Sequence, residues 1–159
     1  MNRVLYAGSF DPITKGHMDV INQASEIFDQ VVVAIMVNRA KQGGLFTLEE
    51  RFEMVSEIYQ HVKNIKVLIS QDLAVEVAIK EECRAMVRGL RDTRDFEAER
   101  NLAKINRKIS EDKIRTIALF SESQYDFVSS SMVRELHQLD QDTSLYVDPV
   151  VQRRLGLKK

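Results

Sequence analysis

Apolar, β-branched runs alternate with helical patterns along most of the chain, and this alternation limits the possible folds more than any other feature. The runs expected as strands lie at residues 4–6, 30–37, 65–69, 85–87 and 114–120. The segment 19–28 between the first two runs has helical spacing, because its apolar residues recur on one helix face. Strands that alternate with helices in this way are typical of a parallel sheet with right-handed crossovers.

This pattern predicts an α/β fold: one Rossmann-like domain over residues 1–159, with a five-stranded parallel sheet and helices on both faces. The length supports a single domain, since most domains have about 100–200 residues. A hydrophobic content of 44% is ordinary for a globular protein and excludes a disordered chain. A domain of this size has a sufficient core without metal or disulfide crosslinks.

Helix start signals support the expected order of elements. Thr47 and Glu50 form a capping box, in which each side chain accepts a backbone hydrogen bond of the first turn. Asp72 is expected to cap a short helix. Residues 92–109 have the pattern of a long charged helix, and its expected buried positions are Phe96, Leu102 and Ile105.

The charge and the cysteine count exclude several classes of protein. The formal net charge of -1 argues against a nucleic-acid partner, which usually requires a basic surplus. The longest apolar run, residues 31–37, is far shorter than the ~20 residues of a membrane span. The single cysteine, Cys83, cannot form an intrachain disulfide, so a cytoplasmic location is expected. The three histidines are too far apart in the sequence for a metal motif, and no protein side chain is expected to bind a metal.

The loop after the first expected strand carries the first group of polar residues. In open parallel sheets, ligands bind beyond the carboxyl ends of the strands. Ser9 supplies a hydroxyl in this loop, and Gly16 and His17 are expected at a helix N-terminus, where free N–H groups favour an anion. A surface turn with an exposed first-turn histidine is the alternative that these residues leave open.

Two arginines follow the fourth expected strand. Arg88 and Arg91 flank Gly89 and Leu90, and guanidinium groups at a strand end can bind phosphate oxygens in bidentate fashion. A solvated charge pair is the alternative. Glu99 on the next helix could pair with these arginines, bind a sugar hydroxyl, or be a plain surface charge.

Two further loops carry groups that suit an anion. Lys41 lies before Gly43 and Gly44, and a lysine in such a loop can close over a phosphate. The serines at 129–131 precede a helix, where hydroxyl and N–H groups can bind a second anion. The alternatives are an ordinary surface lysine and a single N-cap serine. Because no acidic pair or nucleophile–base arrangement accompanies these groups, they suit phosphoryl or nucleotidyl transfer.

Five motifs carry a resemblance to a known family. Residues 14–17, Thr-Lys-Gly-His, resemble the (T/H)-x-G-H signature of the nucleotidyltransferase superfamily. FTLEER at 46–51, RGLR at 88–91, DFEAE at 95–99 and VSSSMVR at 128–134 extend the likeness. In this order and spacing, the motifs are similar to those of the bacterial phosphopantetheine adenylyltransferases over nearly the whole chain.

The resemblance implies a reaction and its partners. The expected reaction is the reversible transfer of an adenylyl group from ATP to 4'-phosphopantetheine, which gives dephospho-coenzyme A and pyrophosphate. This is the penultimate step of coenzyme A synthesis, and it is expected to proceed by direct in-line attack without a covalent enzyme intermediate. The family also implies Mg²⁺ bound through the ATP phosphates, a homohexamer, and coenzyme A as a feedback ligand.

The resemblance also implies roles for single residues. His17 is expected to stabilise the transition state, together with Lys41 and Arg91. The acceptor substrate is expected to contact Ser9, Lys41, Leu73, Ala74 and Arg88. ATP is expected to contact Ser9, Phe10, His17, Gly89, Leu90, Arg91, Glu99, Tyr125, Asp126, Phe127, Val128, Ser129, Ser130 and Ser131.

Two other functions compete with this expectation. An adenylyltransferase of nicotinamide or nicotinate mononucleotide is the nearest, but such enzymes usually have histidine where Thr14 stands. A non-catalytic nucleotide-binding module is the other. The presence of His17, Lys41, Arg88 and Arg91 together argues against a loss of activity.

Overall fold

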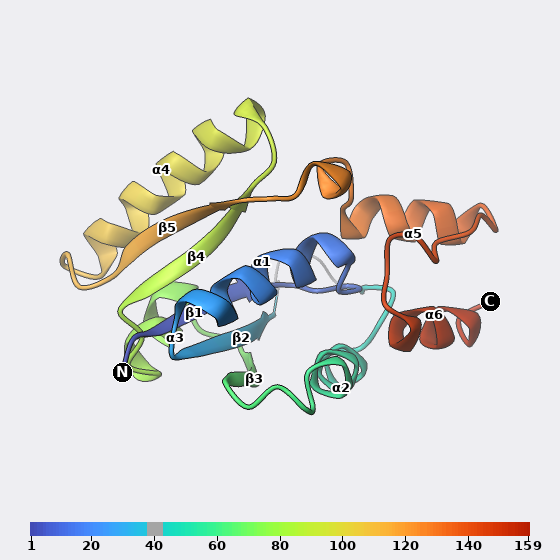
Figure 1. Cartoon of the computed structure of the whole chain (residues 1–159), viewed down its shortest axis with the longest axis horizontal. Coiled ribbons are helices and arrows are strands. Elements are labelled where there is room, and N and C mark those ends of the chain that lie inside the picture. The colour runs from blue at the N-terminus through green and yellow to red at the C-terminus, as the bar shows by residue number, and fades with distance from the viewer. Residues whose placement is uncertain (38–42) are drawn as a thin grey trace.

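The computed structural model describes residues 1–37 and 43–159, and its centre is one five-stranded parallel sheet (Figure 1). The strand order is β3-β2-β1-β4-β5. Strands are added on one side of β1 up to β3 and on the other side from β4 on, so the order reverses between β1 and β4. The strands are β1 (Arg3–Gly8), β2 (Gln30–Met36), β3 (Ile65–Ser70), β4 (Ala85–Leu90) and β5 (Arg115–Phe120). The helices are α1 (Lys15–Ile27), α2 (Leu48–Ile58), α3 (Ala74–Lys80), α4 (Thr93–Ile109), the short 3-10 helix η1 (Ser123–Tyr125), α5 (Ser130–Gln138) and α6 (Pro149–Gly156). The predicted fold class is confirmed.

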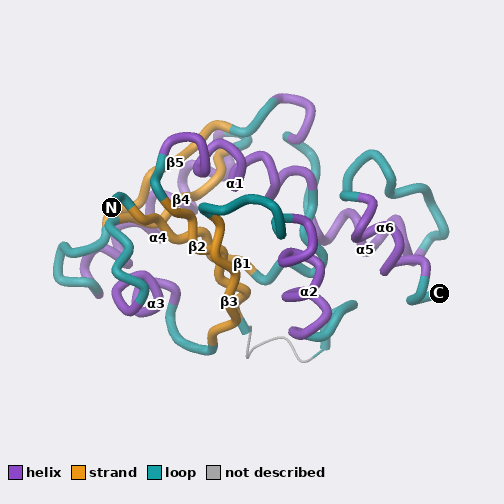
Figure 2. The backbone as a smooth tube through the Cα atoms, turned by 60° about the horizontal axis from the view of Figure 1, so that its bottom comes forward, coloured by secondary structure: helices purple, strands orange, loops and turns teal. Residues whose placement is uncertain are grey.

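Helices cover both faces of the sheet, because strand side chains alternate between the two. Val4 and Tyr6 of β1 join the core that includes residues of α1 and α2. Leu5 and Ala7 point the other way and join the core that includes α3. Figure 2 shows α1 and α3 on opposite sides of the strands. At one end of the molecule, α5 and α6 extend away from α4 (Figure 1).

Side chains that accept backbone N–H groups of the first turn mark the start of several helices. Thr47 forms the predicted capping box with Glu50 at the start of α2. The expected cap of α3 is wrong: Leu73, not Asp72, is the N-cap residue, and its side chain makes no capping hydrogen bond. The Glu76 carboxylate instead accepts the Leu73 N–H at 3.2 Å. Asp72 lies one residue before this N-cap and pairs with Lys80, the last residue of α3.

The fourth strand is longer than the sequence pattern suggests, since β4 continues through Arg88 and Gly89 to Leu90. These residues pair with β5, Gly89 opposite Leu119. A Cβ atom at Gly89 would lie only 2.7 Å from a methyl carbon of Val20 in α1, so the strand passes α1 at a place where only glycine fits. Glycine is rare in strands, so the sequence pattern predicts a strand that ends at residue 87.

The expected burial of three residues on α4 is wrong. Phe96, Leu102 and Ile105 are 54%, 40% and 55% exposed, and no residue of α4 is buried. The helix packs on β4 and β5, and its apolar stripe is left uncovered within this chain. An amphipathic pattern identifies an apolar stripe, but the pattern cannot tell which surface covers it. No helix among the described residues has both the length and the apolar character that a bilayer crossing requires.

Candidate active site

A cavity of about 370 Å³ lies where β1 and β4 end, at the point where the sheet order reverses. This is the position at which open α/β sheets bind ligands. The N-termini of α1 and α5 also border it, and the positive ends of their helix dipoles favour an anion there. Its lining comprises Tyr6, Ala7, Gly8, Ser9, Thr14, Gly16, His17, Val20, Arg88, Gly89, Arg91, Asp95, Glu99, Ser121, Tyr125, Val128, Ser129 and Ser130.

The imidazole of His17 is held in one tautomer. The backbone N–H of Thr14 lies 3.0 Å from Nδ1 of His17, and a backbone N–H can only donate. Nδ1 is therefore the acceptor, and the proton of the neutral ring is on Nε2. The Phe10 ring packs edge-on against the imidazole at 5.1 Å between centroids. A neutral Nε2–H donor is thus fixed at the start of α1, on the lining of the cavity.

The surroundings of His17 keep the ring uncharged. Burial, together with the positive charges of Arg88 and Arg91, lowers the pKa of His17 to about 4. At neutral pH the ring therefore donates a hydrogen bond without carrying a charge.

The lowered pKa of His17 predicts a loss of stability in acid. The pKa falls from 6.5 in the unfolded chain to about 4 in the folded one, so the unfolded chain binds more protons between these values. The part of the free energy of unfolding that depends on His17 is fully present above about pH 6.5 and decreases below it. By about pH 4 the decrease reaches at most about 3 kcal/mol. Urea unfolding of wild type and His17→Gln at pH 7 and pH 4 measures this difference. An equal loss of stability in both proteins would contradict the lowered pKa.

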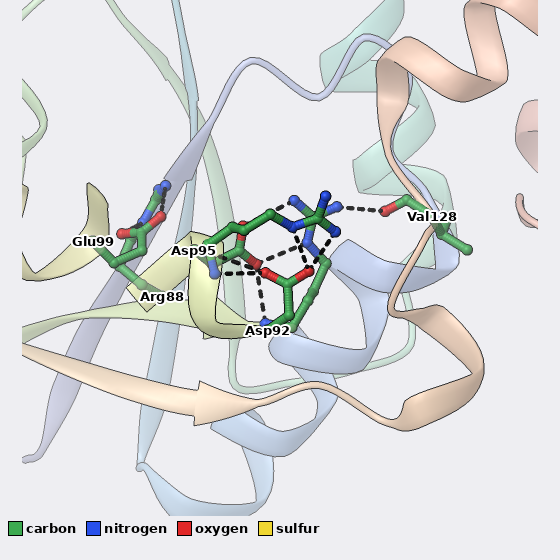
Figure 3. A network of polar contacts seen from close by, with 7 residues as sticks. Arg88, Asp92, Asp95, Glu99 and Val128 are labelled. Atoms are coloured by element: carbon green, nitrogen blue, oxygen red, sulfur yellow. Dashed lines mark hydrogen bonds and ion pairs between the residues drawn. The ribbon is translucent and has the colours of Figure 1, made fainter. Parts of the chain in front are cut away.

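Two arginines at the rim are each clamped by a carboxylate of α4 (Figure 3). Nε and Nη2 of Arg88 donate to Glu99 at 2.8 Å each, and Nη1 donates to the carbonyl of Ala7 at 3.1 Å. Nε and Nη2 of Arg91 donate to Asp95 at 2.9 and 3.1 Å. Both guanidinium planes are therefore fixed beside the cavity, and the hydrogen bonds to Glu99 and Asp95 raise the pKa of each arginine.

The serine segment joins α5 to the loop after β1. Ser129 caps α5 by accepting the N–H of Met132 at 3.1 Å. The hydroxyl of Ser130 donates to the carbonyl of Pro12 at 2.7 Å. The guanidinium of Arg134 donates to the Asp11 carbonyl at 2.7 Å. Direct hydrogen bonds thus tie α5 to the loop that precedes α1.

A second, larger cavity of about 890 Å³ adjoins the first one. Leu73 and Ala74, expected to contact the acceptor, lie on its wall, and α4 contributes Leu102 and Ile109. Both cavities are lined by Ala7, Gly8, Ser9 and Arg88. Two ligands, one in each cavity, would therefore meet at the end of β1.

The structure brings most of the expected ATP-contacting residues to the first cavity. Its lining includes Ser9, His17, Gly89, Arg91, Glu99, Tyr125, Val128, Ser129 and Ser130. Phe10 is 1% exposed and supports the His17 ring from within the core. Lys41 lies outside the described residues. Five expected residues do not line this cavity: Phe10, Leu90, Asp126, Phe127 and Ser131.

Several lining residues have no role in the sequence-based expectations, among them Asp95, Thr14 and Tyr6. Asp95 follows Arg91 by four residues in the first turn of α4, a spacing that favours an ion pair and could have identified it. Thr14 was recognised only as part of a motif. Tyr6 was treated as an ordinary strand residue, and nothing in its spacing distinguishes it from a core tyrosine.

Comparisons with known proteins agree with this geometry. The Cytidylyltransferase-like family model matches residues 5–136. A solved structure from Vibrio parahaemolyticus, described as a "Putative Nicotinate-nucleotide Adenylyltransferase", has a TM-score of 0.65 at 20% identity and covers 98% of this chain and 99% of its own, so it supports the fold alone.

Three curated relatives carry the same name, phosphopantetheine adenylyltransferase. The one from Heliobacterium modesticaldum is 40% identical over 158 residues, which are 99% of this chain and 93% of the relative. Those from Symbiobacterium thermophilum and Methylobacillus flagellatus are 42% and 43% identical, over 99% and 98% of this chain and 96% of each relative. The chain therefore belongs to the phosphopantetheine adenylyltransferase family, within the cytidylyltransferase-like proteins.

Proposed function

We propose that this enzyme transfers the adenylyl group of ATP to 4'-phosphopantetheine, giving dephospho-coenzyme A and pyrophosphate. The observation that carries the proposal is the meeting of two cavities at Ser9 and Arg88. The first is bordered by helix N-termini, His17 and two arginines, which suit a triphosphate. The second has apolar walls at Leu73 and Leu102, which suit a pantetheine arm.

The reaction is a single in-line displacement at the α-phosphorus of ATP. An oxygen of the acceptor phosphate forms a bond to this phosphorus, and the bond to the pyrophosphate oxygen breaks with its electron pair. Nε2–H of His17 donates to an oxygen of the α-phosphoryl group, where negative charge increases in the transition state. No enzyme nucleophile is needed, because the acceptor phosphate attacks directly.

The remaining roles follow from position. Ser9 and Arg88 lie where the two cavities join, so they contact the acceptor phosphate. Arg91 and the N-terminus of α5 with Ser129 and Ser130 contact the ATP phosphates. Lys41 is proposed to neutralise the same phosphates, on the family resemblance alone.

Mg²⁺ is proposed to enter with ATP, held by phosphate oxygens. Among residues 1–37 and 43–159, no group of three His, Cys, Asp or Glu side chains is arranged to hold a metal ion. Asp95 and Glu99, the carboxylates at the cavity, are already paired with Arg91 and Arg88. The ion would supply charge neutralisation of the triphosphate, and the fixed arginines would add to it.

A homohexamer in the cytoplasm and feedback by coenzyme A complete the proposal. The apolar stripe of α4 is exposed, and Phe120 is 82% exposed. Both observations support burial of these side chains between subunits.

Coenzyme A differs from the product dephospho-coenzyme A by one phosphate, so it fits the same two cavities. The free thiol of Cys83 is compatible with a reducing compartment.

Release of pyrophosphate with different acceptors tests the function. We expect turnover with 4'-phosphopantetheine and ATP, and a kcat/KM lower by about 10² or more with pantetheine that lacks the phosphate. The reason is that Arg88 would then lose its counter-charge and the acceptor its nucleophilic phosphate. Nicotinamide mononucleotide should not react. Comparable turnover with that acceptor would instead favour the competing mononucleotide adenylyltransferase.

A further inference from the structure

We propose that the hydroxyl of Tyr6 donates a hydrogen bond to a phosphate oxygen bound beside His17, which makes Tyr6 a further substrate-contacting residue of this enzyme. The inference rests on the proposed function. Its evidence is the position of the side chain, the state of its hydroxyl and the charges around it.

Tyr6 forms part of the floor of the first cavity. The residue lies in the central strand β1, two positions before Gly8 and on the face covered by α1. Its ring packs edge-on against Phe10 at 5.6 Å and lies 6.5 Å from the His17 ring, measured between centroids. Although the residue is only 7% exposed, it lines the cavity. The edge-on contact with Phe10 and the neighbouring His17 ring hold the phenol in one place beside the proposed phosphate site.

The Tyr6 hydroxyl donates no hydrogen bond to any of the described residues. A buried hydroxyl normally has a partner, because an unsatisfied one costs free energy. Tyr59, the other buried tyrosine on this side of the sheet, follows the rule and donates to Asn22 at 3.3 Å. The Tyr6 hydroxyl is not enclosed by protein either, since the fully buried side-chain N and O atoms without a partner among the described residues are Nε of Arg3 and Oε1 of Gln30. It therefore faces the cavity, where a bound ligand can accept its hydrogen bond.

The phenol of Tyr6 is a neutral hydrogen-bond donor among paired charges. Burial raises the pKa of Tyr6 to about 12, so the phenol remains protonated at neutral pH and can donate. The charged groups that act on it are Arg88 and Arg91 together with the carboxylates of Glu99 and Asp19. Glu99 is paired with Arg88, and Asp19 accepts the N–H of Glu122 at 2.9 Å. Arg91 is likewise paired with Asp95, so the charges at the cavity largely offset one another. The uncharged donors that remain, Nε2–H of His17 and the phenol of Tyr6, suit phosphate oxygens.

The substitution Tyr6→Phe tests the contact, with Tyr59→Phe as the matched control. Both changes remove one buried phenol oxygen, but only Tyr6 lines the cavity. We expect Tyr6→Phe to lower kcat/KM by about tenfold to a hundredfold, the usual effect of losing a hydrogen bond to a charged group. We expect Tyr59→Phe to keep the kcat/KM of wild type. The thermal midpoint should fall only in Tyr59→Phe, because only that variant loses a hydrogen bond within the protein.

Binding measurements distinguish the two phosphates that could accept the bond. Calorimetry measures the binding of ATP alone and of phosphopantetheine alone to wild type and to Tyr6→Phe. We expect the variant to bind one of them more weakly, namely the substrate whose phosphate accepts the hydrogen bond of the phenol. Unchanged binding of both substrates with lower kcat would mean a contact made only in the transition state. A kcat/KM of Tyr6→Phe within twofold of wild type would overturn the inference.

If wild type itself showed no turnover, the proposed function would fail, and the ATP titration alone would decide the role of Tyr6. Weaker ATP binding by Tyr6→Phe would still support the phosphate contact. Equal ATP binding by the two proteins would reject it.

Discussion

Replacement of His17 by alanine is expected to lower turnover at least about a hundredfold while most of the ATP affinity remains. Nε2–H of the neutral ring lies at the cavity, held by the N–H of Thr14 on the opposite side of the ring. A fixed donor helps most when the charge on the phosphoryl oxygens is greatest, so its loss affects the transition state more than ground-state binding. Steady-state kinetics together with calorimetric titration of ATP measure the two effects separately.

Two comparisons make the His17→Ala result specific. His61→Ala serves as the control, since His61 is exposed and does not line the cavity. A thermal melt checks that the fold is retained in His17→Ala. Turnover within a few-fold of wild type would remove His17 from the mechanism. Lower ATP affinity with unchanged turnover at saturation would make it a binding residue only.

The second large effect is expected from Asp11→Asn, and it concerns stability. Asp11 is 6% exposed, and its two carboxylate oxygens accept the N–H groups of Leu45 and Phe46, both at 2.9 Å. Arg51 lies against the same carboxylate, with 3.5 Å between Nε and Oδ1. An amide would direct its NH₂ group at one backbone donor and leave the Arg51 charge without its partner. We expect the free energy of unfolding to fall by about 3 kcal/mol.

Urea unfolding of Asp11→Asn and of Asp112→Asn provides the comparison. Asp112 also pairs with arginines, Arg107 and Arg115, but in solvent, where an ion pair contributes little. Asparagine also tolerates the positive φ of 67° at that position. Equal losses of stability in the two variants would show that the Asp11 carboxylate does not hold the loop before α2.

Local patterns were sufficient for much of the architecture. The alternation of apolar runs with helical spacing predicted all five strands, and the capping box at Thr47 predicted the start of α2. These signals are local, because strand alternation and helix caps depend on residues a few positions apart. The prediction failed at β4, where a glycine inside a strand depends on the approach of Val20 from α1.

The sequence predicts those residues of the candidate site that lie in loops directly after a strand. Placing polar loops beyond the carboxyl ends of parallel strands brought Ser9, His17, Arg88 and Ser129 to one cavity, as the structure has them. The spacing of four residues favours the pair of Arg91 and Asp95. The pair of Arg88 and Glu99 has no such signal, since Glu99 lies eleven residues after Arg88 and reaches it only because α4 folds back along β4.

The sequence by itself determined the order of the elements, the parallel sheet and the edge of that sheet where the charged and hydroxyl groups gather. Those properties depend on periodicity and on the chain direction of each strand, which are local. Only the tertiary structure decided the state of each functional group. The lowered pKa of His17 comes from burial and from arginines that are distant in the sequence. That the Tyr6 hydroxyl faces the cavity, with no partner among residues 1–37 and 43–159, is visible only when its neighbours are known. Likewise, the uncovered face of α4 depends on which surfaces meet in space. Solvation and Coulomb interactions act through space, so only the folded chain sets them.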